Sequence, residues 1–305
     1  MASVTLAESA KLEQDMLIQG IIENVIMVDH FFDVLPFEEI TGNALAYNRE
    51  NALGDVQWTT VGTTITAKAA ATFTQVTSSL TTLLGDAEVN GLIQATRSNI
   101  NDQTAVQVGS KAKSIGLAYT DKLINGTGAS NEINGFLDLV TSGQTIDAAT
   151  NGAALSFVLL DQLLDQVTDK NGIVDFMIMH SRTLRSYYAL LRALGGASVG
   201  EVVTLPSGAQ VPGYRGTPIF RNNNVPINQT HGTETAATSV IAGNFDDGSF
   251  KFGVSGLTAM GAAGVRIEDV GTSETKDEKI TRVKMYTGLA NYNSNGLAIV
   301  EGINN

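Results

Sequence analysis

The chain has 305 residues, of which 43% are hydrophobic and only 16% are charged, and its formal net charge at pH 7 is −12. A chain of this length can bury one large core or form two domains, while the negative charge disfavours nonspecific binding to a nucleic acid backbone. The absence of cysteine excludes disulfides, thiol nucleophiles and thiolate metal sites.

Residues 6–28 have the pattern of an amphipathic helix, because apolar pairs recur every four residues from Leu17 to Ile26. The helix either packs on its own domain, which the sequence favours, or forms a terminal arm on a neighbouring subunit. The chain lacks a basic region followed by an apolar core, and it has no run of 18 apolar residues. We therefore expect no secretory signal, no membrane span and synthesis in the cytoplasm.

Residues 54–84 are rich in threonine and other strand-forming residues, and Asp55 and Lys68 are their only charges. A hairpin with arms of about 14 residues would reach roughly 45 Å. Since a 100-residue domain has a radius of gyration near 13 Å, such a ribbon would project well beyond its own body. Since an isolated two-stranded ribbon is marginally stable, we infer that it lies across another subunit. Short strands within one domain are the alternative.

Residues 86–100 are predicted to form a short helix, and a long amphipathic helix follows. From Ala105 to Leu123 apolar residues recur at spacings of three and four, Asp102 can cap the start, and Asn125-Gly126 ends the helix. Such a helix of about 23 residues would be roughly 35 Å long. It therefore needs support along its length.

The second half of the chain alternates between helices and strands, which indicates a mixed α/β layer. The predicted elements are a strand at 136–140, a helix capped by Ser156, a buried strand at 174–180, and a helix capped by Ser181 with Tyr188 facing inward. Further strands are predicted at 238–245, 265–270, 279–289 and 297–303. The strands at 265–270 and 279–289 form a long hairpin that runs alongside the long helix.

The sequence contains no pattern typical of a catalytic, metal or cofactor site. His30, His180 and His231 lie far apart, and none has a second histidine at metal-ligand spacing. There is no Gly-x-Ser-x-Gly elbow, no dinucleotide fingerprint and no phosphate loop. We expect no enzyme activity and no cofactor, although catalytic groups converge in space rather than in sequence.

Several stretches in order resemble the major capsid proteins of tailed double-stranded DNA phages, the Hong Kong phage capsid family. They are LPFEEITGNALAYNRE (35–50), DKLINGTGASNEINGFLDLV (121–140), MIMHSRTLRSYYALL (177–191), GYRGTPIFRNNNVP (213–226), TSVIAGNFDDG (238–248) and TRVKMYTGLANYNSNGLAIVEGI (281–303). The resemblance of each stretch is weak when taken alone, but the stretches occur in the family's order and together cover most of the chain.

The resemblance implies an α+β Hong Kong phage-type capsid fold. Its parts would be an N-terminal arm with the segment leading into the loop, an extended β-hairpin loop, a peripheral domain with a long spine helix, and an axial α/β domain. These parts would span, in that order, residues 1–50, 51–84, 85–128 with 256–285, and 129–255 with 286–305.

Some family members crosslink a loop lysine to an asparagine of a neighbour. Lys68 is the only lysine available in this loop, and residues 271–278 hold no asparagine, so the resemblance predicts noncovalent assembly. The candidate inter-subunit contacts are Trp58, Lys68, Phe73, Lys111 and Lys122.

The resemblance thus implies a virion subunit that assembles into homo-hexamers and homo-pentamers, forming an icosahedral head around DNA without sequence-specific binding. The family's cleaved, charged N-terminal extension is missing here, so the expected partners are a separate scaffolding protein, a portal and a cement protein. The rival functions are an encapsulin-type bacterial nanocompartment shell and a soluble α/β enzyme with an unrecognised site.

Overall fold

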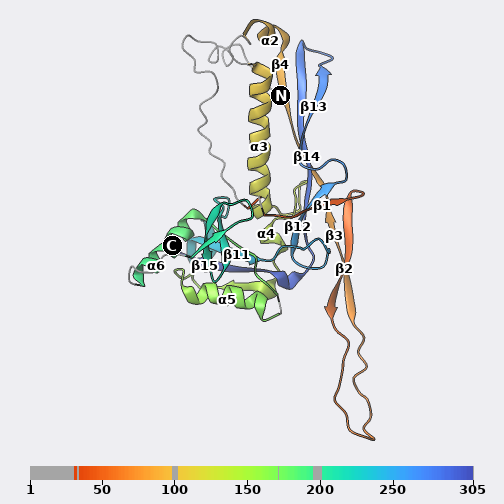
Figure 1. Cartoon of the computed structure of the whole chain (residues 1–305), viewed down its shortest axis with the longest axis vertical. Coiled ribbons are helices and arrows are strands. Elements are labelled where there is room, and N and C mark those ends of the chain that lie inside the picture. Colours follow the sequence, from red (N-terminus) through yellow and green to blue (C-terminus); the bar gives the residue numbers. More distant parts are fainter. Residues whose placement is uncertain (1–30, 33, 98–101, 171, 195–200, 305) are drawn as a thin grey trace.

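A computed structural model describes residues 31–32, 34–97, 102–170, 172–194 and 201–304 (Figure 1). The helix predicted at 6–28 lies outside the described residues. The molecule is elongated, and we name its three parts for use below. A column of helix and sheet stands at one end, a body lies beside its base, and a two-stranded ribbon projects at the opposite end.

The column consists of one long helix on a five-stranded sheet. The helix α3 (Gln103–Asn125) is capped by Asp102, whose carboxylate accepts hydrogen bonds from the backbone N–H groups of Thr104 and Ala105. It packs along two antiparallel strands, β4 (Thr81–Asn90) and β14 (Glu278–Asn291). The remaining strands are β13 (Val265–Thr272), β12 (Val254–Ala259) and β1 (Phe37–Ile40), and the short α2 (Gly91–Arg97) follows β4.

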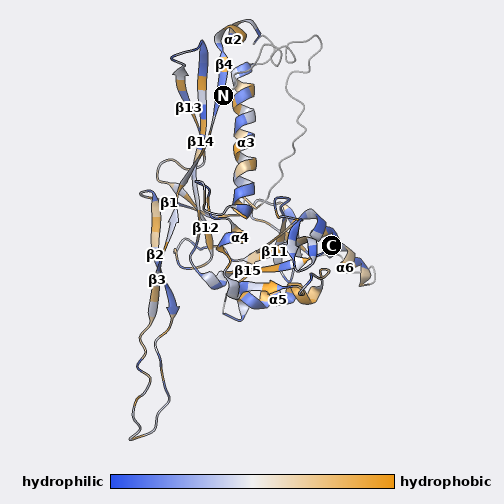
Figure 2. Ribbon diagram, turned by 180° about the vertical axis from the view of Figure 1, so that it is seen from behind, coloured by the Kyte–Doolittle hydropathy of each residue, from blue (hydrophilic) through white to orange (hydrophobic). Residues whose placement is uncertain are grey.

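The body is an eight-stranded sheet covered by helices. Its strands are β5 (Thr145–Asp147), β15 (Leu297–Ile303), β11 (Glu234–Gly243), β6 (Phe176–Met179), β9 (Thr217–Arg221), β8 (Gln210–Tyr214), β7 (Val202–Thr204) and β10 (Gln229–His231). Its helices are α4 (Phe136–Leu139), α5 (Phe157–Thr168) and α6 (Ser181–Ala193), with 3-10 turns at Ser142–Gln144 and Ser294–Gly296. Hydrophobic residues concentrate on α5 and the strands beside it (Figure 2).

Column and body share one hydrophobic core. Leu123 and Ile124 at the end of α3 are fully buried in the same cluster as Phe176 and Leu297 of the body. Phe31 lies at its centre, with its ring edge-on to those of Phe136, Phe176 and Phe220 at centroid distances of 5.7, 5.2 and 5.4 Å. A shared core of this kind fixes the long helix relative to the body sheet.

A second core holds the body together. One face of α5 buries Leu160, Leu163 and Val167 against β6, β11 and β15. Ser156 caps this helix as predicted, because its hydroxyl accepts a hydrogen bond from the Leu159 N–H at 3.3 Å. The strands predicted in the second half are confirmed apart from that at 136–140, with shifts of a few residues at their ends.

Two short segments differ from the sequence prediction. Residues 136–139, within the segment 136–140 that was predicted as a strand, form helix α4, whose Leu139 N–H bonds to the Gly135 carbonyl. So short a segment does not distinguish the two structures by its pattern. Residues 86–90, predicted as helix, are the end of β4, because β4 pairs with β14 without a break from Thr81 to Asn90.

The predicted cap and inner face of α6 were each wrong by one residue. His180 caps the helix, since its Nδ1 accepts the Arg182 N–H at 2.9 Å, and Ser181 is the first helical residue. Tyr187 is the buried tyrosine and Tyr188 is exposed. The Tyr187 hydroxyl donates to the Gly213 carbonyl at 2.7 Å, and burial raises the pKa of Tyr187 to about 12.

Asp86 and Arg282 form a two-pronged ion pair that ties β4 to β14. Nε and Nη2 of Arg282 donate to the two carboxylate oxygens of Asp86 at 2.7 and 2.8 Å, and Asp86 is buried. The Arg282 hydrogen bond lowers the pKa of Asp86 below its ordinary value. A lowered pKa in the folded state means that the pair stabilises the fold above the unfolded-state pKa, and that this stabilisation is lost as the pH falls through the folded pKa.

We predict that Asp86→Asn lowers the free energy of unfolding by about 2 kcal/mol at pH 7, as expected for a charge-assisted hydrogen-bonded pair. The difference from the unaltered protein should be smaller at about pH 3, which lies below the ordinary Asp pKa, because part of the stabilisation is lost there. Urea unfolding at the two pH values measures both quantities. Glu88→Gln, two residues further along β4, is the matched control and should change little. An equal loss at both pH values would contradict the role of the ion pair.

Candidate assembly interface

The ribbon is a long two-stranded projection of the fold. Strands β2 (Ala44–Ala52) and β3 (Thr72–Ser79) pair antiparallel, from Ala44 opposite Ser79 to Ala52 opposite Thr72. The ladder therefore begins ten residues before the predicted hairpin, and residues 81–84, predicted as part of it, belong to β4 in the column. Residues 53–71 continue outward well past the body (Figure 1).

One glutamine joins the arms of the ribbon where the strand ladder has ended. The Gln57 side-chain oxygen accepts hydrogen bonds from the N–H and hydroxyl of Thr66 and from the N–H of Ala67, each at 2.8 Å. The chain reverses at a turn closed by the Thr63 N–H on the Thr60 carbonyl, where Gly62 adopts a φ of +87°. Side-chain bonds thus replace part of the missing ladder.

The base of the ribbon is fastened to the column. The Tyr47 hydroxyl donates to the Asn291 carbonyl at 2.8 Å, and Arg49 donates to the carbonyls of Asn291 and Tyr292 at 2.6 and 3.2 Å. The rings of Tyr47 and Tyr292 also pack edge to face, with centroids 5.1 Å apart. The ribbon therefore leaves the molecule in a defined direction.

The outer ribbon carries large apolar side chains that its own chain leaves uncovered. They are Leu53, Val56, Trp58, Val61, Ile65 and Phe73. Trp58 is fully exposed and is the only tryptophan in the protein. Burying six such side chains would contribute on the order of 10 kcal/mol before the entropy of association is subtracted. An exposed apolar set of this size marks a contact surface.

The five predicted contact residues fall into two groups that the fold does not bring together. Trp58, Lys68 and Phe73 are exposed on the ribbon. Lys111 and Lys122 lie on α3 in the column. Their role between subunits remains a prediction.

The two helix lysines have acidic groups of their own subunit close by. Lys122 Nζ lies 2.7 Å from the Glu132 carboxylate, and this hydrogen bond raises the pKa of Lys122. Lys111 is half-buried, and its charge contributes to lowering the pKa of Asp86. The anchors Tyr47 and Arg49 were missing from the sequence prediction, although their alternate spacing in a strand places them on one face.

A family model described as the phage capsid family matches residues 12–302. The chain belongs to this family. Its members are capsid proteins, so the chain is a structural capsid protein. No curated protein sequence matches it.

Solved structures of phage capsid and related shells share its fold. An encapsulin, SrpI of Synechococcus elongatus PCC 7942, superposes with a TM-score of 0.74 at 18% identity, over 99% of this chain and 97% of that one. The capsid of an empty GTA particle gives 0.70 at 13% identity over 100% of both chains. Microbacterium phage Oxtober96 gives 0.63 at 13% identity over 98% and 99%. The predicted α+β Hong Kong phage-type fold is confirmed.

We predict that Arg49→Ala loosens the ribbon without unfolding the capsid protein. The substitution removes both hydrogen bonds to the β14 end, each contributing roughly 1.5–3 kcal/mol because the guanidinium is charged. Hydrogen exchange of the β2 and β3 amides should become faster, while exchange in the body strands stays unchanged. Glu50→Ala, next to it on the exposed side of β2, is the control. Unaltered exchange in Arg49→Ala would contradict the anchoring role.

Proposed function

We propose that the chain is the major capsid protein of a tailed phage and forms the icosahedral head that encloses double-stranded DNA. The observation that carries this proposal is the ribbon, a projection with exposed apolar side chains and a fixed base. Association is head to tail, with the ribbon of one subunit lying on the column or body of the next. Heterologous contacts of this kind close into rings when the rotation permits, here hexamers and pentamers.

We assign four parts to this function, with the boundaries that the resemblance implies. Residues 1–50 are the arm and the segment leading into the loop, and 51–84 are the extended loop. Residues 85–128 with 256–285 form the peripheral domain, and 129–255 with 286–305 form the axial domain. The column and body of the structure support the last two, because each has its own sheet.

The net charge of −12 supports a container that holds DNA by confinement, because a strongly negative subunit gains nothing from phosphate contacts. Among the described residues, no helix is long and apolar enough to cross a membrane. We further propose that the subunit is made in the host cytoplasm, has no catalytic activity, and meets a separate scaffolding protein, a portal and a cement protein in the virion.

A nanocompartment shell is the second candidate, and the likeness to the SrpI encapsulin favours it. The two functions differ in what the shell encloses, which is DNA in one and an enzyme cargo in the other. Particles made by expressing this chain together with its neighbouring genes distinguish the two functions by what they enclose. A terminase and a portal gene beside this one support the phage head, and a cargo enzyme gene supports the compartment.

We predict that replacing residues 54–70 with Asn-Gly gives a folded subunit that does not assemble. The two residues can close β2 and β3 as a tight hairpin, so circular dichroism should show an intact fold. Electron microscopy and size-exclusion chromatography should show subunits or small oligomers in place of shells. The matched control replaces residues 54–70 with a Gly/Ser segment of the original length, which keeps the length of the ribbon but removes its apolar side chains. This variant should also fail to assemble. Normal shells from the shortened protein would contradict the proposal.

We predict that assembly buries Trp58. Because Trp58 is the only tryptophan in the protein, its intrinsic fluorescence reports this burial without an added label. Free subunits should emit as tryptophan does in water, and shells should emit at shorter wavelength with weaker quenching by acrylamide. A control reporter, Phe157→Trp in a Trp58→Phe background, sits in the body between Tyr187 and Tyr214 and should respond little. An unchanged Trp58 signal in complete shells would show that the ribbon tip stays exposed.

A further inference from the structure

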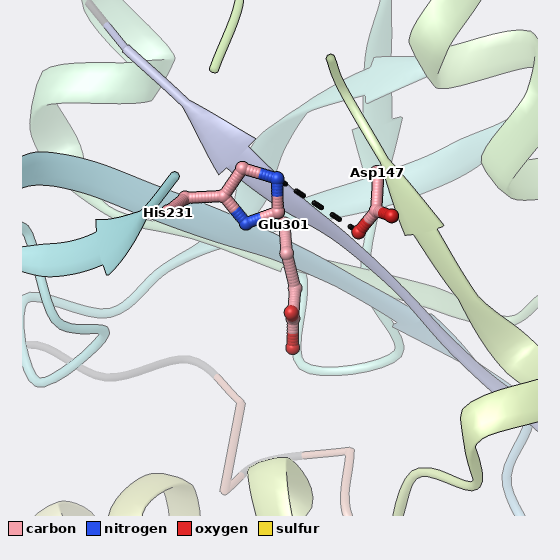
Figure 3. Close-up of side chains that lie close together, drawn as sticks. All are labelled: Asp147, His231 and Glu301. Atoms are coloured by element: carbon pink, nitrogen blue, oxygen red, sulfur yellow. Dashed lines mark ion pairs between the residues drawn. The ribbon is translucent and has the colours of Figure 1, made fainter. Parts of the chain in front are cut away.

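Three side chains from distant segments converge on the body, away from the ribbon. Asp147 on β5 and Glu301 on β15 are direct neighbours in the register of two parallel strands. His231, at the end of β10, points toward Asp147 (Figure 3), with its Nε2 3.9 Å from the Asp147 carboxylate. One nitrogen or oxygen from each of the three side chains lies within 4.8 Å of those of the other two.

Two glycines place the imidazole. A Cβ on Gly302 would lie 2.6 Å from the His231 ring, so only glycine at this position leaves room for it, and its φ of +77° also favours glycine. Gly232, with a φ of +60°, lies against the Thr150 carbonyl, where a Cβ would be 2.2 Å away. The Thr233 N–H donates to the Asn151 side chain at 3.2 Å. His231 is therefore held next to Glu301 by the backbone on both sides.

The cluster has more negative than positive charge. Carboxylates directly opposite on neighbouring strands repel each other, and Asp147 and Glu301 stand in this relation. Within the part of the chain that the structure describes, the Glu301 side chain makes no hydrogen bond or ion pair. The only ion-pair partner of Asp147 there is His231, which is charged only when protonated and lies at a distance near the limit for an ion pair. A bound cation would remove this repulsion.

We propose that Asp147, His231 and Glu301 bind a divalent transition-metal ion of the zinc class. An imidazole nitrogen with two carboxylate oxygens suits such ions, whereas magnesium and calcium prefer oxygen ligands alone. Zinc–ligand bonds of about 2.0–2.2 Å place tetrahedral ligand atoms roughly 3.4 Å apart. The three groups must therefore move closer by up to about 1.4 Å, and Asp147 can make such a movement because its side chain is 69% exposed.

The ion would link two short strands, β5 and β10, to the longer strand β15. Strand β5 has only three residues and forms the edge of the body sheet, and β10 is equally short and, among the described strands, pairs only with β11. Ligands from β5, β10 and β15 tie both short strands to the sheet interior. A fourth coordination position is left for water. The inference stands on the fold of the body and does not depend on the proposed shell function.

The test uses the full chain, freed of metal with EDTA and dialysed, and titrated with zinc chloride by isothermal calorimetry. One ion should bind per subunit and raise the thermal unfolding midpoint. His231→Gln, Asp147→Asn and Glu301→Gln should each weaken binding more than tenfold. Cobalt chloride gives an independent readout, because the visible spectrum of bound Co²⁺ changes with an imidazole ligand and should lose this feature in His231→Gln.

Two matched controls leave the cluster intact. His180→Asn removes another histidine while keeping a helix cap, and Asp169→Asn removes an exposed carboxylate near the end of α5. Both should bind zinc as the unaltered protein does. The absence of one-to-one binding would overturn the proposal, as would binding that the three cluster substitutions leave unchanged in variants whose circular dichroism is that of the folded protein. That second result would mean adventitious binding elsewhere.

Discussion

Strand β14 joins all three parts of the described structure. Its first ten residues pair with β4 on one edge, seven of them also pair with β13 on the other edge, and its last five pair with β12. The carbonyls of Asn291 and Tyr292, at and just beyond its end, hold Tyr47 and Arg49 of the ribbon. Leu289 near that end is buried in the core that column and body share. Helix, sheet and ribbon are therefore fixed to one another through a single continuous strand.

This connection explains why a thin ribbon can serve as a structural element. An isolated two-stranded hairpin has little stability of its own, but here the bonds at its base determine its direction, and Gln57 holds the arms further out. The apolar side chains at the tip remain exposed, because a two-stranded ribbon has no core of its own in which to bury them. Folding buries the core side chains of the column and the body, whereas the apolar side chains of the outer ribbon stay exposed, and in the proposed shell another copy covers them.

Periodicity in the sequence was sufficient to predict the long elements. The helix α3 and the strands β13, β14 and β15 repeat their pattern often enough to identify both type and bounds. Short elements were less predictable: α4 has four residues, and the inner face of α6 was misplaced by one position between Tyr187 and Tyr188. The end of β4 depends on its pairing with β14, nearly two hundred residues later along the chain. The sequence around β4 does not indicate this partner.

The ribbon and the side-chain cluster also differ in how far the sequence predicts them. The ribbon could be predicted because its composition is unusual over thirty residues. The cluster of Asp147, His231 and Glu301 could not, since its members come from three strands and only Glu301 lies in a strongly apolar one. Each residue taken alone is an ordinary polar residue at a strand end or surface. Only the parallel register of β5 and β15 and the space above Gly302 bring the three together.

The distribution of charge limits how the subunits can hold one another. The charges of the column are largely paired within the subunit, as in Asp86 with Arg282 and Lys122 with Glu132. The outer ribbon has almost none, only Asp55 and Lys68 between residues 54 and 84. Contacts made by the ribbon must therefore depend on apolar burial and shape, which salt screens little. In the proposed shell such contacts are individually modest, but each subunit is held both by its own ribbon and by a neighbour's ribbon, and it must lose both contacts to leave.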